Sequence, residues 1–124
     1  MNEGVLGFPS QRRPPSVGLR AFLKLEGTSV PSGAGDPFAV TALKGSYNIK
    51  KVVWSATGQF TVHFEQPMPD SHFVVSGMVK EGASHGLMEV HTSDLGLNDR
   101  KQFRTINLSG TNTNFSEVHI LFFA

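Results

Sequence analysis

Alternation of apolar and polar residues with a period of two runs through most of this chain and limits the folds it can adopt. In residues 59–65, Phe60, Val62 and Phe64 occupy alternate positions, and polar residues separate them. Because successive side chains of an extended strand point to opposite faces, this pattern predicts a half-buried strand. Residues 19–25, "LRAFLKL", repeat the pattern with Leu or Ala at every second position. No segment of helical length shows a period of 3.6.

Further strand candidates are short and are separated by turn residues. The chain holds 13 Gly, 7 Pro and 10 Phe, a composition that favours many turns and an aromatic core. About eight strands at spacings of roughly 8 to 12 residues are typical of a sandwich or a barrel. We therefore expect an all-β fold, a single antiparallel β-sandwich over residues 18–124. Beyond the two segments above, the expected strands cover residues 38–43, 49–54, 71–81, 86–94, 101–110 and 115–124.

Within the sandwich, residues 58–77 carry the most detailed expectation. Phe60, Val62, Phe64, Phe73 and Val75 are predicted to form core. Pro67 and Pro69 lack an N–H and end the strand pairing. The flexible side chain of Met68 is expected to tuck under the end of the hairpin.

Residues 1–17 differ in composition from the rest. The stretch "GFPSQRRPPSVG" has three prolines and two adjacent arginines. Proline cannot donate to a backbone ladder and favours extended backbone, so we predict an extended N-terminal arm. The segment lacks a basic start followed by a long apolar run, so we do not expect a signal peptide. The candidate attachment residues of the arm are Phe8, Arg12, Arg13 and Pro14.

The charge balance gives little guidance to partners. Lys and Arg number 11 and Asp and Glu number 10, a formal charge of +1 in 124 residues, the length of one ordinary domain. Such a balance gives no electrostatic reason to expect binding of nucleic acid, and no apolar run is long enough for membrane insertion. The chain has no cysteine, so disulfides and thiolate metal sites are excluded.

Asp70, Ser71 and His72 are the three residue types of a hydrolase triad, but they adjoin in sequence. Neighbouring side chains of an extended chain point to opposite faces and cannot orient one another as a triad requires. We expect Asp70 and Ser71 to form a turn. The five histidines are scattered without a metal-ligand spacing. The sequence therefore predicts no enzyme, no metal site and no cofactor.

The last expected strand is apolar on both faces at its end. Val118, Ile120 and Phe122 share one face, and Leu121 and Phe123 lie on the other. A second apolar face indicates a second cover, which is either another layer of the same chain or another subunit. We take Leu121 and Phe123 as candidate subunit-interface residues.

Two expected loops are rich in polar groups, residues 81–86 and 93–101. Binding residues often lie on loops, so these segments are the candidates for a receptor site. The residues selected are His85, Asp94, Asp99 and Arg100.

Four segments, in this order, resemble a small β-sandwich domain found in tail-fibre and tail-associated virion proteins of tailed bacteriophages. They are "LRAFLKLEG", "SYNIKKV", "GQFTVHFEQPMPDSHFVV" and "VHILFFA", at residues 19–27, 46–52, 58–75 and 118–124. The resemblance covers about residues 19–124 and is looser over 78–112.

The resemblance implies a structural protein located in the virion, a tail or fibre component that forms a homotrimer with other virion proteins as partners. The arm would then attach it. Two alternatives remain open: a host-receptor or glycan-binding module at a fibre tip, and a capsid decoration (cement) protein.

Overall fold

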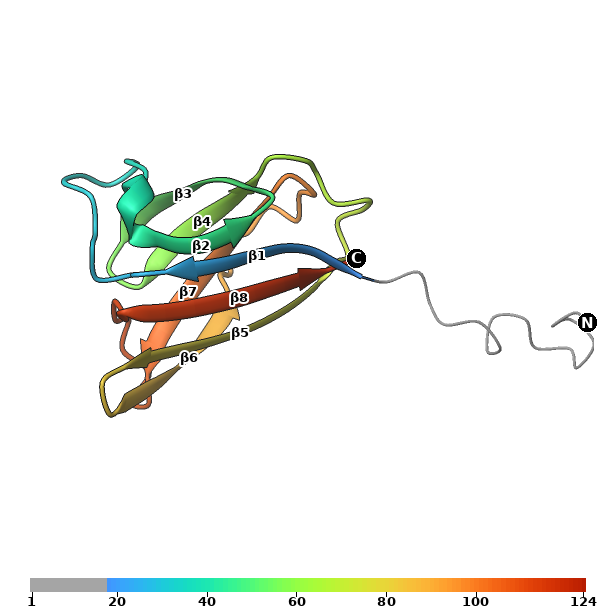
Figure 1. Ribbon diagram of the computed structural model, residues 1–124. Helices are drawn as coiled ribbons and strands as arrows, with labels where there is room; N and C mark the ends of the chain where they lie inside the picture. Colours follow the sequence, from blue (N-terminus) through green and yellow to red (C-terminus); the bar gives the residue numbers. More distant parts are fainter. Residues whose placement is uncertain (1–17) are drawn as a thin grey trace, which may run out of the picture.

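The computed structural model describes residues 18–124, in which eight antiparallel strands form one continuous sheet (Figure 1). The expectation of an all-β fold with about eight strands is confirmed. The predicted arm, with Phe8, Arg12, Arg13 and Pro14, lies outside the described residues. The strands are β1 (Leu19–Leu25), β2 (Leu43–Tyr47), β3 (Ile49–Ala56), β4 (Gln59–Phe64), β5 (Val74–Glu81), β6 (Ser84–Val90), β7 (Arg100–Asn107) and β8 (Glu117–Phe123).

The strand order β2-β1-β8-β5-β6-β7-β4-β3 places two consecutive strands, β2 and β3, at opposite edges of the sheet. Since Asn48 alone separates them in sequence, the edges must come together, and the sheet rolls into a nearly closed, barrel-like shape (Figure 1). The first residues of β6 pair with β5 and its later residues pair with β7. The expected sandwich of two separate sheets is not confirmed, because β6 connects the two halves.

The inward-facing residues of the strands form one hydrophobic core. Phe60, Val62 and Phe64 are buried as predicted, while Phe73 and Val75 are partly buried and pack against the core. Three aromatic rings, those of Phe64, Phe73 and Phe103, meet Phe122 edge-on or tilted, with ring centroids 4.9 to 6.2 Å apart. Such pairs add to the stabilisation from area burial. The predicted burial of Met68 is also confirmed, at 2 % exposure.

The prediction of a strand over residues 38–43 is wrong. The chain forms a 3₁₀ turn, η2 (Val40–Ala42), and β2 begins only at Leu43. Phe38 and Ala42 point into the core whereas Val40 is 85 % exposed. The apolar composition of this segment therefore reflects two separate buried residues and not a continuous strand face.

Two further boundaries differ from the expectation because side chains close local turns. His91 was expected inside a strand, but β6 ends at Val90, and the Ser93 N–H donates to His91 Nδ1 over 2.9 Å. At the start of β5, the His72 N–H donates to Asp70 Oδ1 over 2.7 Å. This hydrogen bond is an Asx turn, so the predicted role of Asp70 as a turn former is confirmed.

Candidate functional site

An apolar face covers the outside of four neighbouring strands. Cross-strand pairing aligns Tyr47 of β2, Phe22 of β1 and Leu121 of β8 in one row, and Ser76 of β5 continues it. The rings of Phe22 and Tyr47 stack with centroids 6.3 Å apart. Leu121 therefore lies in the middle of a row drawn from four strands that are distant in sequence.

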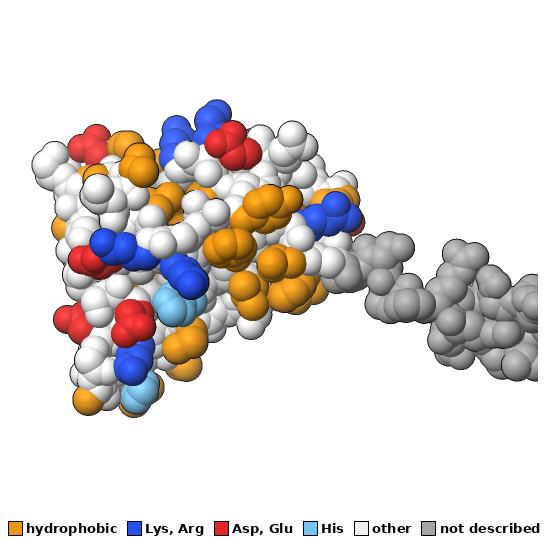
Figure 2. Space-filling view, in the orientation of Figure 1, with side chains coloured by type: hydrophobic (Ala, Val, Ile, Leu, Met, Phe, Trp, Pro, Cys, Tyr) orange, Lys and Arg blue, Asp and Glu red, His pale blue; other side chains and the backbone are white. Residues whose placement is uncertain are grey.

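A second row extends this surface toward the chain end. Leu19 pairs with Phe123, which also pairs with Val74 of β5. Figure 2 shows hydrophobic side chains gathered over β1, β8 and β5 on this side of the molecule. We call the surface the apolar face and define it by Leu19, Phe22, Tyr47, Val74, Met78, Leu121 and Phe123.

The apolar face is hollowed next to Leu121. A cavity of about 390 Å³ is lined by Phe22, Met78, Leu121 and Ser76, with Lys24 and His119 at its side. The hollow is present because Ser76, a small residue, stands between the larger Val74 and Met78 on the same face of β5. A cavity of this size and lining accepts an apolar side chain from another molecule.

The structure places both sequence-predicted interface residues on this face. Leu121 keeps 42 % of its surface exposed within the described residues. Soluble proteins rarely leave a contiguous apolar patch without a partner. Phe22 and Tyr47 were not selected from the sequence as surface residues of interest. Phe22 could have been found, because it is an aromatic residue on the polar side of the alternation in residues 19–25.

Of the four candidate receptor residues, Asp94 and Arg100 line one cavity, while His85 lies outside it. His85 lies in β6, where it pairs with Lys80 of β5, and not in the expected loop. Asp99 and Arg100 form a bidentate ion pair, Nε–Oδ1 and Nη2–Oδ2, both 3.1 Å, with each side chain more than two-fifths exposed. Asp94 is 9 % exposed.

Asp94 holds the loop between β6 and β7. Its Oδ1 accepts from the Gln102 N–H at 2.8 Å, and its Oδ2 accepts from Lys101 Nζ at 3.2 Å and from the Gly96 N–H at 3.1 Å. Burial alone would raise the pKa of Asp94, but these bonds outweigh it and hold the pKa below its ordinary value. Lys101 Nζ also sits 4.7 Å from the centre of the Phe73 ring. The contacts assign Asp94 a structural part in the loop.

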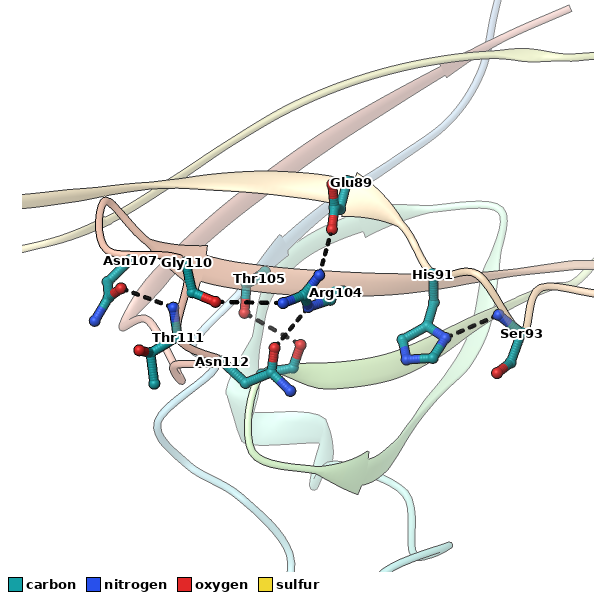
Figure 3. A network of polar contacts seen from close by, with 10 residues as sticks. Glu89, His91, Ser93, Arg104, Thr105, Asn107, Gly110, Thr111 and Asn112 are labelled. Carbon is teal, nitrogen blue, oxygen red and sulfur yellow. Dashed lines mark hydrogen bonds and ion pairs between the residues drawn. The ribbon is translucent and has the colours of Figure 1, made fainter.

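The Arg104 guanidinium group makes three hydrogen bonds within the fold. Figure 3 shows it between Glu89, Asn112 and Gly110. It donates from Nη1 to Glu89 Oε1 at 2.8 Å, from Nε to Asn112 Oδ1 at 2.6 Å and from Nη2 to the Gly110 carbonyl at 3.3 Å. These three bonds connect β6, β7 and the segment that follows β7, so Arg104 has a structural role.

Residues 18–124 contain no group of three His, Asp or Glu side chains that could hold a metal ion. Over the same residues, no helix has the length and apolarity needed to cross a membrane. The Asp70 carboxylate accepts from the backbone N–H of His72 and so is used in its turn.

Comparison of the chain with protein-family models, curated proteins and solved structures found no match. The resemblance to tail-associated virion domains stays a prediction from the sequence.

Proposed function

We propose that this protein is a structural virion component of a tailed bacteriophage, part of its tail or fibre, which oligomerises through the apolar face. The observation that carries the oligomerisation is the exposure of Leu121 in the middle of an apolar row built from β2, β1, β8 and β5. The virion assignment comes from the sequence resemblance, and the predicted arm would attach the assembly to a neighbouring virion protein.

A second copy of this chain is the partner that we assign to the apolar face. In the proposed trimer, copies of Leu121 would come together near the three-fold axis; the number of subunits comes from the sequence resemblance. Lys24 and His119 stand beside the hollow and leave Leu121, Phe22 and Met78 free to meet apolar neighbours. Burial of these side chains contributes about 25 cal/mol for each Å² removed from water.

The test is the mass of the full chain by light scattering at micromolar concentration. We expect a trimer, and Leu121→Glu should convert it to a monomer because three carboxylates would meet at the axis. Leu108→Glu is the matched control, since Leu108 is 75 % exposed in the turn after β7 and lies outside the apolar face. Circular dichroism of both variants checks that the fold is kept. A wild-type monomer, or a folded Leu121→Glu trimer, would overturn the oligomerisation.

A further inference from the structure

A basic row crosses the outside of the other half of the sheet. Lys51 of β3 pairs with His63 of β4, and His63 pairs with Arg100 of β7. Directly paired residues of antiparallel strands place their side chains on the same face, about 5 Å apart at Cβ. Three basic side chains therefore stand next to one another, and Asp99 balances the charge of one of them, Arg100.

The next row supplies neutral hydrogen-bonding groups. Val53 pairs with Thr61, and Thr61 pairs with Gln102. His63 and Arg100 of the first row, the second row and the loop after β6 line an open cavity of about 280 Å³, formed by Val53, Thr61, His63, Ser93, Asp94, Leu95, Arg100 and Gln102; Lys51 lies beside it. We call it the polar hollow.

Several groups of the polar hollow remain available to a ligand. In the described part of the chain, Ser93 and Gln102 are bonded through their backbone N–H groups, which leaves the hydroxyl and the side-chain amide open. Arg100 uses Nε and Nη2 on Asp99, so Nη1 is open as well. Lys51 is not a member of any ion pair among residues 18–124.

The electrostatics of the hollow favour an anion. Burial lowers the pKa of His63, and the positive charges of Arg100, Lys51 and Lys50 lower it further, against a smaller opposite effect of Asp99. Lys101 balances the charge of Asp94, and two backbone N–H groups hydrogen-bond its carboxylate. An anion placed in the hollow would meet His63 and Arg100 of its lining, with Lys51 next to His63 in the same row, and its charge would raise the pKa of His63.

The lining also indicates what carries the anion. Leu95, which is 77 % exposed, and Val53 provide apolar contacts beside Thr61, Ser93 and Gln102. A sugar ring presents C–H groups on one side and hydroxyls at its edge, which matches this mixed surface. We propose that the polar hollow binds an anionic sugar, with its carboxylate or phosphate against His63 and Arg100, its hydroxyls against Thr61 and Gln102, and Lys51 beside His63 at the margin of the hollow.

The experiment uses the full chain and follows its NMR signals in the presence of four probes: glucuronate, glucose 6-phosphate, glucose and N-acetylglutamate amide. We expect glucuronate or glucose 6-phosphate to shift the signals of His63, Thr61 and Gln102. Glucose cannot make a charge-assisted hydrogen bond, so it should bind at least about tenfold more weakly. Comparison of the first two probes distinguishes carboxylate from phosphate as the preferred group. If N-acetylglutamate amide binds more tightly than both anionic sugars, the proposed sugar ligand is wrong and the hollow binds an acidic peptide instead.

A pH titration of the His63 NMR signal gives a second test of binding. The pKa of His63 should not change on addition of the anion if the residue has only a structural role. Bound anion should raise the pKa of His63, and His63→Gln identifies its signal. Lys51→Gln should weaken binding of the anionic probe about tenfold, while Lys44→Gln, in β2 and outside the lining of the hollow, serves as the control for lost positive charge. The inference is wrong if no anionic sugar shifts these signals at millimolar concentration. Leu121→Glu should bind like the wild type, so a failed trimer does not affect the outcome.

Discussion

Two hydrogen bonds join Asn48 and Gln66 at the point where the rolled sheet closes. Asn48 Oδ1 accepts from the Gln66 N–H at 2.7 Å, and Asn48 Nδ2 donates to the Gln66 carbonyl at 3.1 Å. The same Nδ2 donates to the Arg20 carbonyl at 3.1 Å. One side chain therefore connects β1 with the segment that follows β4, and these two strands are the neighbours of the edge strands β2 and β3.

The backbone of Asn48 explains why Asn occupies this position. Its φ of 58° lies in the left-handed region, which Asn tolerates better than most other residues. We expect Asn48→Ala to lower the free energy of unfolding by about 2–4 kcal/mol, from lost hydrogen bonds and from φ strain. Asn48→Gly removes the same bonds without that strain and should cost about 1 kcal/mol less. Urea unfolding measures both, and equal losses would show that the backbone conformation contributes nothing.

Asp94 should make the free energy of unfolding depend on pH in the acidic range. Its folded-state pKa lies below the ordinary value of 3.8, so the stability it contributes is complete above that value and is lost as the pH falls through the folded pKa. Asp94→Asn removes this part of the dependence and leaves the nearly buried Lys101 without its partner. We expect a loss of about 2–3 kcal/mol at neutral pH and a much smaller loss in strong acid.

Thermal unfolding of wild type and Asp94→Asn across the acidic range checks this expectation. The two curves of melting temperature against pH should approach each other as the pH falls. A constant separation at every pH would mean that the carboxylate charge is not what stabilises the loop.

Most strands and much of the core could be predicted from the sequence because the signal is local. Alternation in residues 59–64 places Phe60, Val62 and Phe64 inside, whatever strand lies next to them. Lys101 shows the limit of that rule: it occupies an inward position of β7, and its burial depends on Asp94, seven residues away.

The closure of the sheet and the two surfaces could not be predicted in the same way. Phe22, Tyr47 and Leu121 become neighbours only through the pairing of β1 with both β2 and β8. The row of Lys51, His63 and Arg100 likewise requires the order β3-β4-β7. Strand order depends on long-range pairing, which a period-two pattern does not encode.

Gly58 should not tolerate a side chain. Its φ is +68°, and an added Cβ would lie 2.5 Å from the Thr105 carbonyl oxygen and 2.7 Å from the Thr113 nitrogen, both backbone atoms. Gly58→Ala should therefore destabilise the protein by about 3 kcal/mol or more. Gly110 is the matched control: its φ of +84° carries similar strain, but nothing lies within 4 Å of the added Cβ.

Gly110→Ala should cost only about 1 kcal/mol, the strain of a left-handed backbone alone. Chemical denaturation of the two variants separates strain from steric conflict. If both lose the same free energy, the close approach of Gly58 to the Thr105 and Thr113 backbone has no energetic consequence.

Met68 connects the hairpin end to the loop after β6. Its side chain is 2 % exposed, its N–H donates to the Asn98 carbonyl at 2.8 Å, and its carbonyl accepts from Asn98 Nδ2 at 3.0 Å. Met68→Ala leaves the backbone bonds in place but opens a cavity in the core, so we expect a loss of about 3 kcal/mol. Met78→Ala is the control, since that side chain is 53 % exposed and should change stability by less than about 0.5 kcal/mol. Both substitutions are best compared in the Leu121→Glu background, where Met78 would be free of any subunit contact. Similar losses of unfolding free energy for the two methionines would mean that Met68 is not packed as the structure shows.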